Sequence, residues 1–229
     1  MKIPPVIILG MHRSGTSCLT GSLQEAGLDL VSVDEKPHTN PKGNRENIRI
    51  MDLNNAVLEA SGATWYTPPE EPCPWTPEQR AWRDRLLADY PSDRAWGFKD
   101  PRTLLVLEGW IEALPRAQLV GTFRHPLRVA SSLKARNGFE IERGFALWKN
   151  YNQRLLQAIE GQKIPLICFD WPRERYDAAL RSLTKQLGLH VPEAGFTFFE
   201  PDLRSNLDDL DAELPNQVWE VYQKLLERT

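Results

Sequence analysis

The chain has 229 residues, of which 41% are hydrophobic and 26% are charged. This length and composition predict one globular domain, residues 1–229, whose core needs neither a metal nor a disulfide to be stable. The formal net charge of −3 counts against a nucleic-acid binder, which usually carries a basic balance, but a local cationic site for a small polyanion is compatible with it.

Short apolar runs rich in Val, Ile and Phe predict four buried strands, at Val6–Leu9, Ala95–Phe98, Leu119–Phe123 and Ile164–Phe169. Amphipathic patterns predict helices at Thr16–Ala26, Asn47–Ala60, Pro77–Ala88, Leu127–Arg136, Phe145–Ile159, Tyr176–Leu187 and Pro215–Leu226. This alternation favours an α/β fold, a three-layer sandwich with a parallel sheet covered on both faces. Ligands bind at the carboxyl ends of such strands, so we expect the polar residues directly after the apolar runs to carry the chemistry.

Residues 61–76 do not fit the alternation. They contain four prolines, which forbid regular structure, together with three large aromatic residues, Trp65, Tyr66 and Trp75. One interpretation is a covering loop that its aromatic side chains attach to the core. The other is a lid or acceptor-binding loop, in which Trp65 stacks on a sugar or an aromatic ring.

The segment GMHRSGTS, residues 10–17, follows the first predicted strand and leads into a predicted helix. A glycine-bearing turn at a helix N-terminus is an anion-binding arrangement, because free backbone N–H groups converge there and the helix dipole is positive. Gly10 and Gly15 have the spacing of a Walker A loop, but Thr16 stands in place of the lysine. The candidate anion-binding residues are His12, Arg13, Ser14, Gly15, Thr16 and Ser17.

The sequence HRSGTS resembles the 5′-phosphosulfate loop of sulfotransferases that use 3′-phosphoadenosine 5′-phosphosulfate (PAPS). A second resemblance supports this one. Arg124 ends the third apolar run and Ser132 follows eight residues later, which is similar to the pair that binds the 3′-phosphate in this family. The fold that the resemblance implies is a P-loop-NTPase-like parallel sheet.

The tripeptide Lys99-Asp100-Pro101 ends the second predicted strand and resembles the protein-tyrosine and bacterial branches of the family. The resemblance implies that Lys99 stabilises charge at the transferring group. Glu46 stands where glycan- and protein-modifying relatives have a glutamate base; the other interpretation is that it complements a helix dipole. His12 is a weaker candidate for the base. Asp100 is expected to pair with a neighbouring cation or to turn the chain.

Two arginines are assigned less directly. Arg102 is a partner for Asp100 or a contact to an anionic acceptor. Arg204 lies in FEPDLR, which resembles a late family segment whose basic residue approaches the donor.

The resemblance therefore implies a PAPS-dependent sulfotransferase that works by in-line displacement without a metal. The catalytic residues would be Arg13, Glu46 and Lys99. The acceptor, a small molecule, a glycan or a peptide, is not identified. Two alternatives stay open: a P-loop kinase that uses ATP, for which Asp170 is the only Walker-B-like carboxylate, and an inactive nucleotide-binding module.

Two further expectations concern the whole chain. The first apolar run is too short for a signal peptide, and no stretch approaches the roughly 18 apolar residues of a membrane span, so we expect a cytoplasmic protein. Cys18, Cys73 and Cys168 are odd in number and form no CxxC pair, so neither a disulfide framework nor a zinc site is expected.

Overall fold

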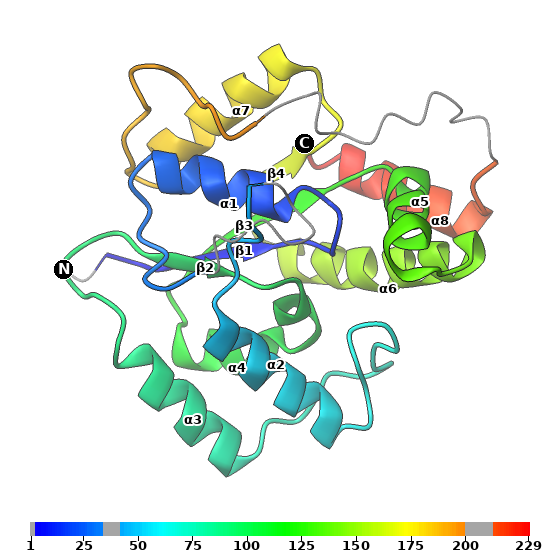
Figure 1. The fold of residues 1–229 in the computed structure, drawn as a ribbon, viewed down its shortest axis with the longest axis horizontal. Coiled ribbons are helices and arrows are strands. Elements are labelled where there is room, and N and C mark those ends of the chain that lie inside the picture. The colour runs from blue at the N-terminus through cyan, green and yellow to red at the C-terminus, as the bar shows by residue number, and fades with distance from the viewer. Residues whose placement is uncertain (1–2, 34–41, 200–212) are drawn as a thin grey trace.

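The computed structural model describes residues 3–33, 42–199 and 213–229 (Figure 1). Its sheet has four parallel strands: β1 (Val6–Leu9), β2 (Gly97–Lys99), β3 (Gln118–Phe123) and β4 (Leu166–Cys168). Their order is β2-β1-β3-β4, so β1 lies between two strands that come later in the chain. All four predicted strands are confirmed. β2 is shifted toward its carboxyl end, and Lys99 is its last residue, opposite Ile8 of β1.

Two hydrophobic clusters cover the two faces of the sheet. Successive side chains of a strand point to opposite faces, and in β1 the side chains of Ile7 and Leu9 join one cluster while Val6 and Ile8 join the other. Helices α1 (Thr16–Glu25) and α7 (Arg173–Gln186) cover the second face, above the sheet in Figure 1. The first face is covered by α2 (Ile48–Ala60), α3 (Pro77–Leu87), α4 (Leu107–Ala113), α5 (Pro126–Asn137), α6 (Ile141–Ile159) and α8 (Asn216–Leu226). The predicted three-layer α/β sandwich is therefore confirmed.

The seven predicted helices are all present, with ends that differ by a few residues. α6 begins at Ile141, four residues before the predicted start, because Ile141 is followed by Glu, Arg and Gly and the regular apolar pattern starts only at Phe145. α4 and a 3-10 helix at Pro101–Leu105 were not predicted. Asp100 caps that 3-10 helix and Pro101 is its first residue, a start signal that the sequence does contain. Within the described ranges, no helix is long and apolar enough to cross a membrane.

The segment 61–76 contains no helix or strand and lies against the core. Trp75 is buried against Trp110 with their ring centroids 5.7 Å apart, and its indole Nε1 donates to the Val106 carbonyl. Trp65 packs against the same hydrophobic cluster. The tertiary structure thus attaches this loop to the core at two aromatic side chains.

Candidate active site

The carboxyl ends of the parallel strands bring the predicted polar residues to one edge of the sheet. β1 leads into the loop 10–17, and its two neighbours end at Lys99 and just before Arg124. The strand order changes direction at β1, which is the usual position of a ligand site in an open α/β sheet. Residues more than a hundred positions apart in the chain therefore surround one loop.

The loop between β1 and α1 is held in a narrow range of conformations. Gly15, the N-cap of α1, has φ +84°, and Arg13 has φ +66°, which is unusual for a residue with a side chain. Thr122 of β3 donates from Oγ1 to the Ser14 carbonyl at 3.2 Å. The N–H groups of the first helical turn have no intrahelical partner, so the loop presents donors to an anion.

We expect Gly15→Ala to abolish anion binding by the loop. A Cβ at this position would lie 2.3 Å from ring atoms of Phe169, in addition to the unfavourable positive φ. Gly27→Ala is the matched control, because Gly27 has φ +96° but no atom within 4 Å of the added methyl. Calorimetric titration with a nucleotide and thermal unfolding of both variants would measure the difference. Equal effects on binding would contradict the steric argument.

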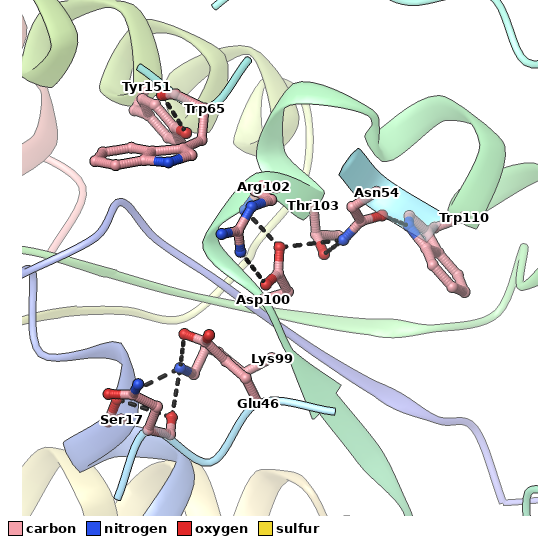
Figure 2. Close-up of polar contacts among 11 residues, drawn as sticks. Ser17, Glu46, Asn54, Trp65, Lys99, Asp100, Arg102, Thr103, Trp110 and Tyr151 are labelled. Carbon is pink, nitrogen blue, oxygen red and sulfur yellow. Dashed lines mark hydrogen bonds and ion pairs between the residues drawn. The ribbon is translucent and has the colours of Figure 1, made fainter. Parts of the chain in front are cut away.

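Lys99 and Glu46 form an ion pair beside this loop. The Lys99 Nζ donates to Glu46 Oε1 at 2.7 Å and to the Asn44 carbonyl at 2.6 Å, and it lies 3.4 Å from Ser17 Oγ (Figure 2). The lysine side chain is 1% exposed and that of the glutamate is 17% exposed. The two residues predicted to act on the reacting groups are thus in contact with each other and next to the loop.

The backbone before α2 places Glu46 in this contact. Gly43 and Arg45 both have positive φ, +76° and +57°, so the chain turns sharply on either side of Asn44. The Asn44 carbonyl accepts from both Ser17 Oγ and Lys99 Nζ. Glu46 lies just before the N-cap of α2, Asn47, and outside the helix. The partner of Glu46 is the Lys99 side chain. The alternative interpretation, in which Glu46 only complements the dipole of the following helix, does not include this ion pair.

Asp100 points to the other side of the strand end, into a buried polar network (Figure 2). It accepts from Arg102 Nη1 at 2.7 Å and from Asn54 Nδ2 at 3.2 Å. Trp110 Nε1 donates to Asn54 Oδ1 at 2.9 Å and so fixes the amide. Burial raises the pKa of Asp100. The predicted pairing of Asp100 with a cation is observed. Asn54 and Trp110 were not predicted, because nothing in a helical pattern marks an asparagine that faces a buried carboxylate.

Arg124 and Ser132 both lie near the loop. Ser132 Oγ accepts from Arg13 Nε at 2.7 Å. Arg124 Nε donates to Asp170 Oδ1 at 3.2 Å, while its buried Nη2 has no hydrogen-bond partner in the described part of the chain. The other Asp170 oxygen accepts from the backbone N–H of His125. Asp170 is therefore engaged by an arginine and a backbone amide, which does not fit a metal-binding Walker-B carboxylate.

His12 lies between the loop and the covering segment. Its ring centroid is 4.6 Å from that of Trp65 and 5.9 Å from that of Tyr151, and the Tyr151 hydroxyl donates to the Trp65 carbonyl. Burial and the positive charges nearby hold the pKa of His12 well below its ordinary value. His12 is therefore a weaker base here than an ordinary histidine.

Positive charge is concentrated at this edge of the sheet. Burial, followed by the charges of Arg136 and Arg124, lowers the pKa of Arg13. Burial likewise lowers the pKa of Arg124. Arginines that are partly desolvated and repel one another make a site suited to a polyanion. Arg204, the last predicted residue, lies outside the described residues.

Residues 4–193 match the model of the sulfotransferase family. The sulfotransferase domain of the olefin synthase of Synechococcus PCC 7002 superposes with a TM-score of 0.61 at 18% identity, covering 99% of this chain and 96% of that one. The sulfotransferase domain from the curacin biosynthetic pathway gives 0.58 at 16% identity and covers 99% of both chains. At such identities the likeness shows the P-loop-NTPase-like fold. A search of curated proteins found no match.

Proposed function

The chain belongs to the sulfotransferase family, and from this premise we propose that it transfers a sulfonate group from PAPS to a hydroxyl or amine of an acceptor. The observation that carries the proposal is the Lys99–Glu46 ion pair beside the loop 10–17. It supports the proposal because a cation that could donate to the leaving oxygen and a carboxylate that could take the proton of the acceptor lie together beside this loop.

The unpartnered donors near the loop fit the two anionic groups of PAPS. Ser14 Oγ and Arg124 Nη2 are buried and have no hydrogen-bond partner among the described residues. Arg13, Ser14, Gly15, Thr16 and Ser17 would hold the 5′-phosphosulfate, with His12 beside them. Arg124 and Ser132 would hold the 3′-phosphate, which distinguishes PAPS from ATP. Arg204 is proposed to contact PAPS on the basis of its sequence resemblance alone.

The reaction divides between two residues of this chain. PAPS supplies an activated sulfonate with a phosphate oxygen as the leaving group. Glu46 accepts the proton of the acceptor as the acceptor oxygen or nitrogen bonds to sulfur. Lys99, whose Nζ already lies 3.4 Å from Ser17 Oγ, donates to the bridging oxygen as its bond to sulfur breaks. Arg13 offsets the negative charge of the transferring group. A sulfonate carries less charge than a γ-phosphoryl group, so these cations take the role that Mg²⁺ has in a kinase.

The test is calorimetric titration with 3′-phosphoadenosine 5′-phosphate, the desulfated product, without Mg²⁺. We expect a micromolar Kd, with AMP at least tenfold weaker because it lacks the 3′-phosphate. Parallel titrations use ATP with Mg²⁺. Preferential binding of ATP–Mg²⁺ would replace the proposal with the kinase alternative, and binding without transfer to any acceptor would favour an inactive nucleotide-binding module.

A further inference from the structure

Two arginines, Arg102 and Arg136, lie near the proposed reacting groups but are not among the residues proposed to bind PAPS. In Figure 2 the Arg102 guanidinium lies between the Lys99–Glu46 pair and Trp65. The charges of Arg102 and Arg136 both lower the pKa of His12, whose ring contacts Trp65. Arg136, near the end of α5, lies over the Trp65 ring with its guanidinium carbon 5.7 Å from the centroid. Arg136 therefore contacts Trp65, and both arginines act electrostatically on His12.

Arg102 is oriented by buried partners and still has a free edge. Its Nη1 donates to Asp100, which Asn54 and Trp110 hold in place in turn. Its Nε is buried and has no hydrogen-bond partner in the described ranges. Because the side chain is only 12% exposed, solvent does not readily satisfy this donor. An anion bound in front of Arg102 would accept a hydrogen bond from this Nε.

Arg136 brings a second positive charge to the same place. Its pKa is lowered by burial and by the charge of Arg102, and the carboxylate of Glu46 opposes this. None of the ion pairs formed by the described residues includes Arg136. Lys99 and Arg102 each have a carboxylate partner, so about one uncompensated positive charge remains on the acceptor side.

His12 adds an independent sign of a ligand. Its side chain is buried, at 8% exposure, and Nδ1 has no hydrogen-bond partner among the residues described. A buried polar atom without a partner is costly unless a bound molecule or water satisfies it. The His12 ring stands against Trp65, and the positive charges of Arg102 and Arg136 both act on it.

We propose that the acceptor is a hydroxy acid whose carboxylate binds between Arg102 and Arg136. Its apolar part would lie against Trp65, and its hydroxyl would meet Glu46. A single uncompensated charge matches a monoanionic carboxylate better than a dianionic phosphate, and arginine binds carboxylates in a bidentate manner. This inference rests on the proposed function, because the position of the hydroxyl depends on Glu46 acting as the base.

The test compares acids with their amides on protein saturated with 3′-phosphoadenosine 5′-phosphate. The probes are 4-hydroxybenzoate with 4-hydroxybenzamide, and 3-hydroxyoctanoate with its amide, observed by ligand NMR. In at least one pair we expect the acid to bind at least tenfold more tightly than the amide. Equal affinities in both pairs, or no binding of either acid, would overturn the proposal. If the bisphosphate itself fails to bind, the proposed function fails instead, so the two failures are distinguishable.

Variants assign the effect to the arginines. Arg136→Gln should remove most of the preference for the acid over its amide, measured on protein saturated with the bisphosphate. Arg143→Gln is the matched control, because Arg143 lies 4.2 Å from the centroid of Phe139 and contacts the Tyr66 ring, whereas Arg136 lies over Trp65. Arg102→Lys is used in place of alanine, because the buried Asp100 needs a cationic partner to fold. An acid preference that survives in both Arg136→Gln and Arg102→Lys would contradict the assignment.

Discussion

Glu46→Gln is expected to reduce the rate of sulfonate transfer by about 10²–10⁴-fold, the usual contribution of a positioned general base. The amide keeps the shape of the side chain, and its oxygen can still accept the hydrogen bond from Lys99 Nζ that Glu46 Oε1 accepts at 2.7 Å. It cannot take up a proton. The bisphosphate should bind about as tightly as it binds to the wild-type protein, since the proposed role of Glu46 concerns the acceptor.

The measurement is product formation with saturating PAPS, together with the calorimetric Kd of the bisphosphate. Glu112→Gln is the control, because Glu112 is a surface carboxylate that also pairs with a cation, Arg80, on α3. A normal transfer rate in Glu46→Gln would remove Glu46 from the mechanism and return His12 to consideration. A loss of bisphosphate binding would mean that the ion pair with Lys99 shapes the donor site.

Arg124→Ala is expected to weaken bisphosphate binding by about 10- to 100-fold. A hydrogen bond to a charged group contributes about 1.5–3 kcal/mol, and each 1.4 kcal/mol changes the affinity tenfold. The buried Nη2 without a partner is the donor expected to meet the 3′-phosphate. Affinity for AMP should stay nearly constant, so that the selectivity for the bisphosphate over AMP falls by the same factor.

Arg128→Ala separates this effect from a simple rearrangement of Asp170. Arg128 Nε lies 3.5 Å from the same Asp170 oxygen that pairs with Arg124. If both variants weakened bisphosphate binding equally, the cause would be the loss of a counter-charge for Asp170. If AMP and the bisphosphate weakened together in Arg124→Ala, the arginine would be acting on the 5′ end of the nucleotide.

The elements of this fold follow from local patterns in the sequence. The strands are apolar runs because both faces of the sheet are buried, and the helices carry one apolar stripe. The sequence pattern did not predict α4, and this too has a local cause. It has only seven residues, and the preceding apolar stretch gives no clear helical period.

The candidate site was predictable where a residue follows a strand directly. Lys99 and Arg124 end or follow strands, and the loop 10–17 lies between a strand and a helix, so sequence position alone placed them at one edge of the sheet. Glu46 was found only through its resemblance to a family position. Asn54 and Trp110 lie inside helices, where a sequence pattern does not reveal that they hold Asp100.

The sequence by itself thus determined the α/β class, the glycine-bearing loop between the first strand and the first helix, and the identity of the charged groups that follow the strands. Only the tertiary structure decided which of those groups meet. The strand order places β1 between β2 and β3, and this order brings Lys99 and Ser132 to the same loop. In the tertiary structure the Trp65 ring also packs against His12. Arg136 lies over the same Trp65 ring, and none of the ion pairs of the described residues includes Arg136. Contacts of this kind join residues far apart in the chain, and packing of the whole domain fixes them rather than any local propensity.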